Sequence, residues 1–341
     1  MAATDTATAA SVEREYRALR EGCGLVDRSE RGKLALTGAG AVEFLNGQVT
    51  NELAGLRPGE GRYAAFLTHK GKMLGDLRIL AVGDDPAKGP RELALDTERV
   101  ALQALFDMVR RFQIGYEVEL HKRTLERGLL SLVGPHAGRI AAAGGLPQAE
   151  HANASVEIAG IEALAVRTSS GVDLICDAAD TRRLSAALCE RGAEPVSEAA
   201  AEIVRVERGE PRYGVDLDDT TIPQEAGLNE RAVSFSKGCY VGQETVARLY
   251  YKGKPNRHLR GLRLSEPIAP GAELRLGERV LGRLSSAVIS PPFGPIGLAL
   301  VRRETQPGAR VSAGEDGASA EVVELPFGRV DSRRTPSGDS G

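Results

Sequence analysis

The order of strand-like and helical segments in the first third of the chain constrains its fold most. Short alternating or apolar runs predict strands, in order, over 33–37, 62–68, 76–82, 92–95 and 116–120. The glycine-bearing turn 69–72 predicts a hairpin, and Thr97 is the expected N-cap of an amphipathic helix over 98–112. A parallel sheet would need a crossover, usually a helix, between its strands, so this order predicts a mixed α+β unit.

A second unit of similar texture and a different C-terminal part follow. The sequence predicts strands over 129–133 and 156–167, and amphipathic helices over 181–191 and from Ser197 to Arg208. Beyond Gly253-Lys254-Pro255, short β-type runs separated by glycine and proline predict a small all-β barrel or sandwich. The polar tail 331–341 is predicted to be disordered.

Length and charge bound the class of protein. A chain of 341 residues is longer than one hydrophobic core usually supports, so two or three domains are expected. Its 44 basic and 47 acidic side chains nearly balance, which argues against nucleic acid as a partner. No apolar run is long enough for a bilayer, and residues 1–10 lack the pattern of a secretory signal. The four cysteines form no Cys-x-x-Cys pair, so a reduced cytoplasmic protein without a metal site is predicted.

The segment Lys237-Gly-Cys-Tyr-Val-Gly-Gln-Glu244 has the features of a reactive site. Two glycines bracket Cys239, so the backbone there can turn tightly. Helical character from Gln243 onward places the thiol just ahead of a helix N-terminus, where the dipole stabilises a thiolate. Lys237 would lie on the same side of an extended backbone and lower the pKa of the thiol further. Cys239 and Lys237 are therefore the predicted catalytic residues.

The alternative for Cys239 is a cysteine that only packs. That role is the default for Cys23, Cys176 and Cys189, because free cysteines are among the most buried residues. The five histidines are scattered, so no Cys–His pair is visible. Surface or capping roles are predicted for each of them, including His151.

Polar segments on both sides of Cys239 indicate a ligand. Upstream, residues 213–225 combine carboxylates with a Pro-Gln-Glu turn, which suits a ring with several N–H donors such as a pterin. A solvated acidic loop is the alternative. Downstream, a basic stretch with two tyrosines begins at Arg248 and suits the glutamate tail of a folate, or RNA. A solvated linker is the alternative for most of that stretch.

The run 237–248, Lys-Gly-Cys-Tyr-Val-Gly-Gln-Glu-Thr-Val-Ala-Arg, resembles the signature of the YgfZ-type folate-binding proteins. These are relatives of the glycine-cleavage aminomethyltransferase that act in iron–sulfur protein maturation. Further blocks are similar to the family and follow its order: 36–51, 66–77, 133–137, 207–217, 222–225 and 294–303.

The resemblance implies a three-domain ring of the aminomethyltransferase type, with a folate site near the junction of the domains. Two mixed α+β domains, the first interrupted by the second, meet a C-terminal antiparallel β-barrel. The implied domains are 1–52 with 124–252, 53–123, and 253–330. Tetrahydrofolate or a one-carbon derivative is the implied cofactor. Its predicted contacts are Asp76, Glu225, Tyr240, Gln243 and Arg248.

Two departures from the aminomethyltransferases affect the predicted chemistry. Those enzymes carry a paired Asp-Asp where this chain has Gly75-Asp76, and a Thr-Gly-Glu stretch where it has 169–173. The changes predict that the pterin cleft persists while glycine-cleavage chemistry is lost.

The principal prediction is therefore a tetrahydrofolate-binding factor of iron–sulfur cluster assembly or repair, with a reactive Cys239. Its predicted partners are folate and iron–sulfur proteins or their assembly machinery. A folate-dependent aminomethyl- or methyltransferase, an enzyme of one-carbon transfer, is the first alternative. A non-catalytic folate-binding module is the second.

Overall fold

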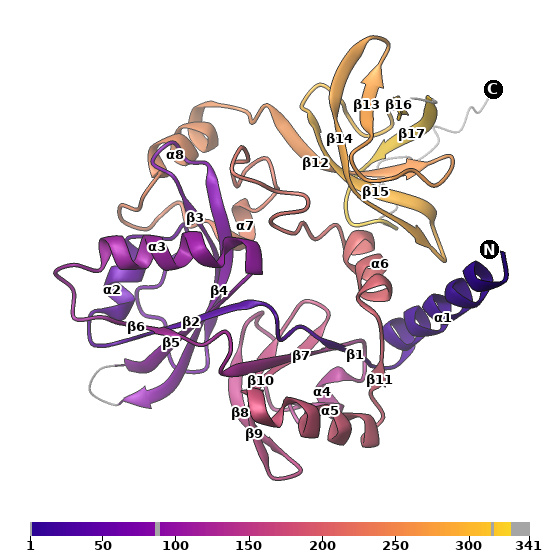
Figure 1. Ribbon diagram of the computed structural model, residues 1–341. Coiled ribbons are helices and arrows are strands. Elements are labelled where there is room, and N and C mark those ends of the chain that lie inside the picture. The colour runs from indigo at the N-terminus through magenta and orange to yellow at the C-terminus, as the bar shows by residue number, and fades with distance from the viewer. Residues whose placement is uncertain (1, 86–88, 315–316, 329–341) are drawn as a thin grey trace, which may run out of the picture. The chain divides into compact units, whose positions relative to one another are not determined.

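The computed structural model describes residues 2–85, 89–314 and 317–328 (Figure 1). The chain divides into two compact units, Met1–Val204 with Arg212–Asn256, and Arg205–Pro211 with Arg257–Gly341. Among the described residues, the first unit holds a five-stranded and a six-stranded sheet, and the second holds a closed barrel. The tail 331–341, which is predicted to be disordered, lies outside the described residues.

The five-stranded sheet contains the strands predicted in the first third of the chain. Its order is β3–β4–β5–β2–β6, with bounds Gly61–Leu67, Met73–Asp85, Gly89–Thr97, Gly32–Thr37 and Glu119–Lys122. Neighbouring strands are antiparallel, and the direct connections β3–β4 and β4–β5 are hairpins. The 3₁₀ turn η1 (Arg99–Ala101) and helix α3 (Leu102–Phe112) cover one face, where α3 crosses the strands in Figure 1. Helix α2 (Ala41–Asn46) follows β2.

The six-stranded sheet has the order β11–β1–β7–β10–β9–β8. The bounds are Glu194–Pro195, Gly24–Asp27, Arg127–Val133, Gly171–Asp177, Ile161–Arg167 and Asn153–Ile158. Helices α4 (Ala137–Ile140) and α5 (Thr181–Glu190), the latter after the 3₁₀ turn η2 (Ala178–Asp180), pack on this sheet. Aliphatic side chains such as those of Leu132, Leu174 and Leu184 fill the space between helices and sheet.

The barrel of the second unit closes in the order β12–β15–β14–β13–β16–β17. The bounds are Arg257–Leu264, Gly294–Arg302, Arg279–Ser290, Glu273–Leu276, Arg310–Ala313 and Ala318–Val323. Every pairing is antiparallel, and the interior is aliphatic, with Leu262, Leu284 and Val322 fully buried. Closure leaves no exposed strand edge, which stabilises a small all-β unit.

The remaining helices are α1 (Ala2–Glu21), α6 (Glu198–Arg208), α7 (Asn229–Ala232) and α8 (Gln243–Lys252). Ser197 caps α6 as predicted, since its hydroxyl accepts the Ala200 N–H at 3.3 Å. Helix α1 is not among the predicted elements, although its alanine-rich start favours a helix. The predicted N-cap role of Thr97 is wrong, because its hydroxyl donates to the Asp76 carbonyl at 2.5 Å instead.

The predicted mixed α+β fold with a C-terminal antiparallel barrel is confirmed. The domain boundaries 1–52 with 124–252, 53–123, and 253–330 stay predictions. Within the described parts of the chain, no helix combines the length and the apolar character that crossing a membrane requires.

Candidate functional site

Charged side chains gather on one face of the five-stranded sheet. Side chains alternate across a strand, so Asp76 and Arg78 of β4 project from the face opposite to Leu77. Arg78 pairs in register with Tyr63 of β3 and with Asp96 of β5. Leu77 is buried and α3 packs on β4, whereas Arg78 on the opposite face reaches Asp173 of the six-stranded sheet.

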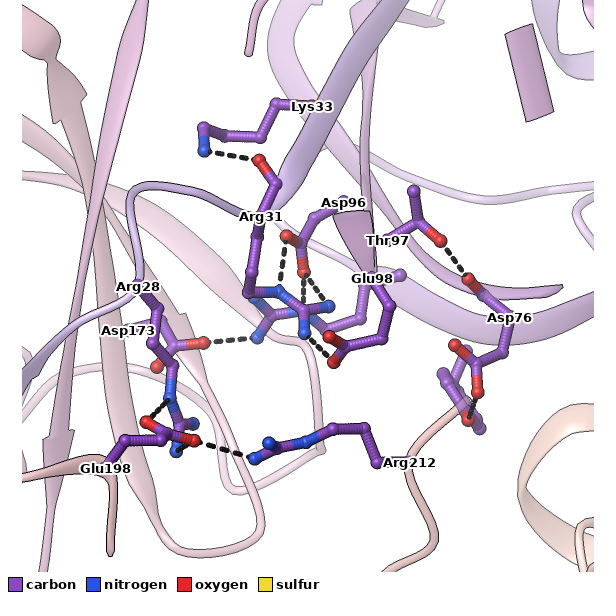
Figure 2. A network of polar contacts seen from close by, with 12 residues as sticks. Arg28, Arg31, Lys33, Asp76, Asp96, Thr97, Glu98, Asp173, Glu198 and Arg212 are labelled. Atoms are coloured by element: carbon purple, nitrogen blue, oxygen red, sulfur yellow. Dashed lines mark hydrogen bonds and ion pairs between the residues drawn. The ribbon is translucent and has the colours of Figure 1, made fainter. Parts of the chain in front are cut away.

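Asp96 is the centre of this charged face (Figure 2). Its carboxylate is 1% exposed and accepts hydrogen bonds from Arg31 at 2.9 and 3.0 Å and from Arg78 at 2.7 Å. Arg78 also donates to Asp173 of β10 at 2.5 Å, and Arg31 pairs with Glu98. Burial alone would raise the pKa of Asp96, but the two guanidinium groups outweigh it and hold that pKa well below its usual range. The network ties the two sheets together.

Asp76, on the same face, is hydrogen-bonded by the side chain of Tyr63. The Tyr63 hydroxyl donates to Asp76 Oδ2 at 2.7 Å, and the Asp76 side chain is buried. Burial raises the pKa of Asp76 to about 6, although the hydrogen bond from Tyr63 lowers it. A carboxyl group with a pKa near 6 exchanges its proton close to neutral pH, as general acid–base catalysis requires.

Three residues that sequence reasoning did not select surround Tyr63. The rings of His151 and Tyr63 lie 6.2 Å apart, and the Arg231 guanidinium is 5.2 Å above the Tyr63 ring. Arg231 donates to Glu150 Oε1 at 2.5 Å, and the same oxygen is 3.7 Å from His151 Nε2. Burial, assisted by the positive charge of Arg78, lowers the pKa of His151 to about 4. The surface or capping role predicted for His151 is wrong, because this side chain is buried.

No local pattern marks these three residues in the sequence. Glu150 and Arg231 are 81 positions apart, and only the folded chain brings them together. The His151-Ala152 pair is a common loop sequence, so it gives no sign that His151 is buried.

Residues 231–243 form the second candidate region. Ser234 N–H donates to the Thr50 carbonyl at 3.0 Å, and this contact anchors the segment on the loop 46–51. Gly242 has a φ of +84° directly before α8, and a Cβ atom there would stand 2.4 Å from the Thr68 carbonyl oxygen. Only glycine fits such a left-handed position pressed against the β3–β4 turn. The predicted helix start at Gln243 is confirmed, and Cys239 lies exposed just ahead of it.

Lys237 occupies a socket of backbone carbonyls. Its Nζ donates to the carbonyl oxygens of Asn46, Val49 and Asn51 at 2.6, 2.9 and 2.7 Å. An ammonium group has three hydrogens, so these contacts use all of them. Burial lowers the pKa of Lys237 to about 8. The contacts hold the loop 46–51 against the Cys239 segment, and the action of Lys237 on the thiol stays a prediction.

The other predicted folate contacts lie in the turn 222–225 and at the start and on the surface of α8. Glu225 is buried and accepts a backbone N–H of its own turn at 3.2 Å. The side chain of Gln243 accepts the Tyr240 N–H at 3.2 Å, and burial raises the pKa of Tyr240 to about 12. Arg248 is exposed on α8. Among the described residues, none of these four hydrogen-bonds with Asp76.

Cys239 is expected to react with iodoacetamide before the other cysteines. Its side chain is exposed, whereas Cys23 and Cys176 are buried, and burial raises the pKa of Cys23 to about 11. The thiolate is the reacting species, so alkylation at neutral pH should be roughly 10-fold or more faster at Cys239 than at Cys23. Mass spectrometry of peptides from a timed reaction measures the order, with urea-unfolded protein as the control in which the difference disappears. Equal rates in the folded protein would contradict the expectation.

The stability of the protein is expected to depend on pH through Asp76. The pKa of its carboxyl group is about 6 in the folded protein and 3.8 ordinarily, so folding favours the protonated form. Asp76 therefore contributes stability that is fully present below about pH 4 and is lost as the pH rises through about 6. Two pKa units correspond to ~3 kcal/mol in the free energy of unfolding.

Urea unfolding of the wild-type protein and Asp76→Asn, at about pH 4 and about pH 7.5, measures this effect. The variant should gain ~3 kcal/mol relative to the wild type at the higher pH, because asparagine has no proton to lose. A constant difference between the two proteins would show that the Asp76 pKa is not raised.

The chain matches known proteins over most of its length. The family of the GCVT N-terminal domain matches residues 3–237. An aminomethyltransferase of Rubrobacter xylanophilus is 30% identical, over 97% of this chain and 90% of the relative. An aminomethyltransferase of Geobacillus kaustophilus is also 30% identical, over 94% and 91%. The crystal structure of glycine cleavage system aminomethyltransferase T from Bartonella henselae agrees with a TM-score of 0.81 at 27% identity, over 93% of this chain and 89% of that one. The predicted fold type is thereby confirmed.

These comparisons correct the principal functional prediction, an iron–sulfur assembly or repair factor. The relatives that match nearly the whole chain carry the name aminomethyltransferase, which favours the first alternative. The prediction relied on the segment 237–248 and on the loss of an acidic residue at Gly75. One buried carboxyl with a raised pKa is enough to exchange a proton, so that loss does not by itself remove the chemistry.

Proposed function

The chain belongs to the family of the GCVT N-terminal domain, and from this membership we propose that it is a folate-dependent aminomethyltransferase. The observation that carries the proposal is the buried Asp76 carboxyl, with its pKa raised to about 6 and its Oδ2 hydrogen-bonded by Tyr63. Similarity over at least nine tenths of the two relatives named above supports the same chemistry.

The residues around Asp76 suit tetrahydrofolate. A reduced pterin ring presents N–H donors and acceptors side by side, and such a ring needs polar side chains in a buried setting. Asp76 supplies a carboxylate acceptor, and both ring nitrogens of the buried His151 have no hydrogen-bond partner among the described residues. Buried polar atoms are rarely left unpaired in the native state, so these atoms favour a polar ligand at this place.

Asp76 moves a proton in the proposed reaction. Tetrahydrofolate, when bound, would supply the two nitrogens, one in the pterin ring and one beside it, that accept the one-carbon unit. The Tyr63 hydroxyl occupies Asp76 Oδ2, which leaves Oδ1 to take a proton from an attacking nitrogen. The same carboxyl group, once protonated, would return the proton to the departing amine. The carbon bonds to both nitrogens as its bonds to the amine and to the group that carried it break, and the proton of the second nitrogen goes to that carrier group. A pKa of about 6 keeps both forms accessible near neutral pH.

The Cys239 segment has a secondary place in the proposal. Tyr240, Gln243, Glu225 and Arg248 are proposed as further folate contacts, with the positive charge of Arg248 directed to the glutamate tail. Cys239, with Lys237, is proposed to act after folate is bound. Iron–sulfur partners depended on the corrected role and form no part of this proposal, and a cytoplasmic location stays a prediction.

Calorimetric titration of the reduced protein with tetrahydrofolate tests the proposal. The wild-type protein and Cys239→Ala are both expected to bind, because the exposed thiol lies outside the group around Asp76. Heat of binding absent from the wild-type titration at millimolar ligand would overturn the folate-dependent function. Loss of binding in Cys239→Ala alone would place the thiol in the folate site itself.

A further inference from the structure

His151 carries a set of features that packing does not explain. Its backbone has a φ of +66°, a left-handed conformation that residues other than glycine rarely adopt. Its side chain is 5% exposed, and neither Nδ1 nor Nε2 has a hydrogen-bond partner among the described residues. Backbone strain of this kind is common at functional sites.

The fold builds a place for this ring. The His151 N–H donates to the Arg167 carbonyl at 2.9 Å, which fixes the left-handed turn. At Gly61, the first residue of β3, a Cβ atom would stand 2.7 Å from the Cβ of His151. Glycine at position 61 therefore leaves the space that the histidine occupies beside Tyr63.

We propose that His151 is a ligand-contacting residue of the Asp76 site, and that its imidazole hydrogen-bonds the pterin ring of folate; this inference rests on the proposed function. The imidazole is neutral at pH 7, so it offers one donor and one acceptor. An unpaired buried donor or acceptor destabilises the folded protein, and a ligand that pairs with it recovers that cost on binding.

The neighbours of His151 include a partly exposed ion pair. Glu150 and Arg231 form an ion pair at 2.5 Å whose side chains are 33% and 40% exposed. Glu150 Oε1, which pairs with Arg231, also lies near His151 Nε2 but beyond hydrogen-bond distance. Arg231 also lies over the Tyr63 ring. Arg231 therefore connects the Glu150 carboxylate beside His151 with the Tyr63 ring, whose hydroxyl holds Asp76.

The test is calorimetric titration of His151→Phe with tetrahydrofolate and with a tetrahydropterin that lacks the glutamate tail. Phenylalanine keeps the ring and removes both nitrogens, so Kd for both ligands should weaken about tenfold, the effect of one lost neutral hydrogen bond. The urea midpoint of the free protein checks that the variant folds. His151→Asn keeps a donor and an acceptor and tolerates a left-handed backbone, so it should stay within about threefold of the wild type. His136→Phe, at an exposed histidine, is the matched control and should bind as the wild type does.

The outcomes separate this inference from the function on which it rests. A wild-type protein that binds tetrahydrofolate, with an unchanged Kd in His151→Phe, would overturn the role of His151 and leave the proposed function standing. Weakening for tetrahydrofolate but not for the tetrahydropterin would overturn the contact to the pterin ring. A wild-type protein that binds neither ligand would remove both proposals. If His151→Phe does not fold, His151→Leu gives the same comparison with a smaller side chain.

Discussion

In Asp76→Asn, the rate of aminomethyl transfer to tetrahydrofolate is expected to fall by about 100- to 10,000-fold. Asparagine keeps the size of the side chain and an amide oxygen that can take the place of Asp76 Oδ2 as acceptor of the Tyr63 hydroxyl, but it cannot exchange a proton. The loss should therefore appear in kcat, while Kd for tetrahydrofolate changes much less. Formation of methylenetetrahydrofolate and ammonia from an aminomethyl donor measures the rate.

Two variants show whether the effect belongs to the proton of Asp76. Tyr63→Phe removes the hydrogen bond that lowers the pKa of Asp76, so the acid side of the pH–rate profile should move to higher pH. Asp177→Asn, at an exposed aspartate that ends β10, should keep the wild-type rate. A rate in Asp76→Asn within about threefold of the wild type would exclude Asp76 as the acid–base group.

Asp96→Asn is expected to destabilise the first unit by about 3–5 kcal/mol. Asp96 is the shared acceptor of Arg31 and Arg78, and both guanidinium groups lie between the sheets with only 19% and 11% of their side chains exposed. Neutralising the carboxylate leaves two buried cations with Glu98 and Asp173 as their remaining partners. Urea unfolding followed by far-ultraviolet circular dichroism measures the loss.

A salt bridge at the surface is the matched control for Asp96. Arg127 and Asp177 pair at 2.5 Å with 43% and 66% of their side chains exposed. Solvent screens such a pair, so Asp177→Asn should cost no more than about 1 kcal/mol. Similar losses of unfolding free energy in the two variants would mean that the buried Asp96 network contributes no more stability than an exposed salt bridge.

Local sequence determined much of the fold of this chain. Alternation of apolar residues places β2, β3 and β4, and the polar turn 69–72 identifies the hairpin between the last two. Short runs between glycines and prolines identify the C-terminal barrel, and Gly242 precedes the helix that begins at Gln243. These features depend on neighbours in the chain, so the sequence carries them directly.

The contacts and pKa values of the site depend on tertiary structure and cannot be predicted from local sequence patterns. Lys237 has the spacing to lie beside Cys239, but packing directs its ammonium group to three backbone carbonyls of the loop 46–51. The family resemblance predicts Asp76 as a folate contact. Its raised pKa comes from burial and from Tyr63 on the neighbouring strand.

The sequence by itself therefore determined most of the strands, several of the helices and the residue types that carry charge. Only the tertiary structure decided which carboxyl group is paired with arginine, which is buried beside a phenol, and where His151 lies. The reason is physical: secondary structure follows from the periodicity of nearby residues, whereas a pKa and a hydrogen-bond partner follow from solvent exclusion and from contacts between distant parts of the chain.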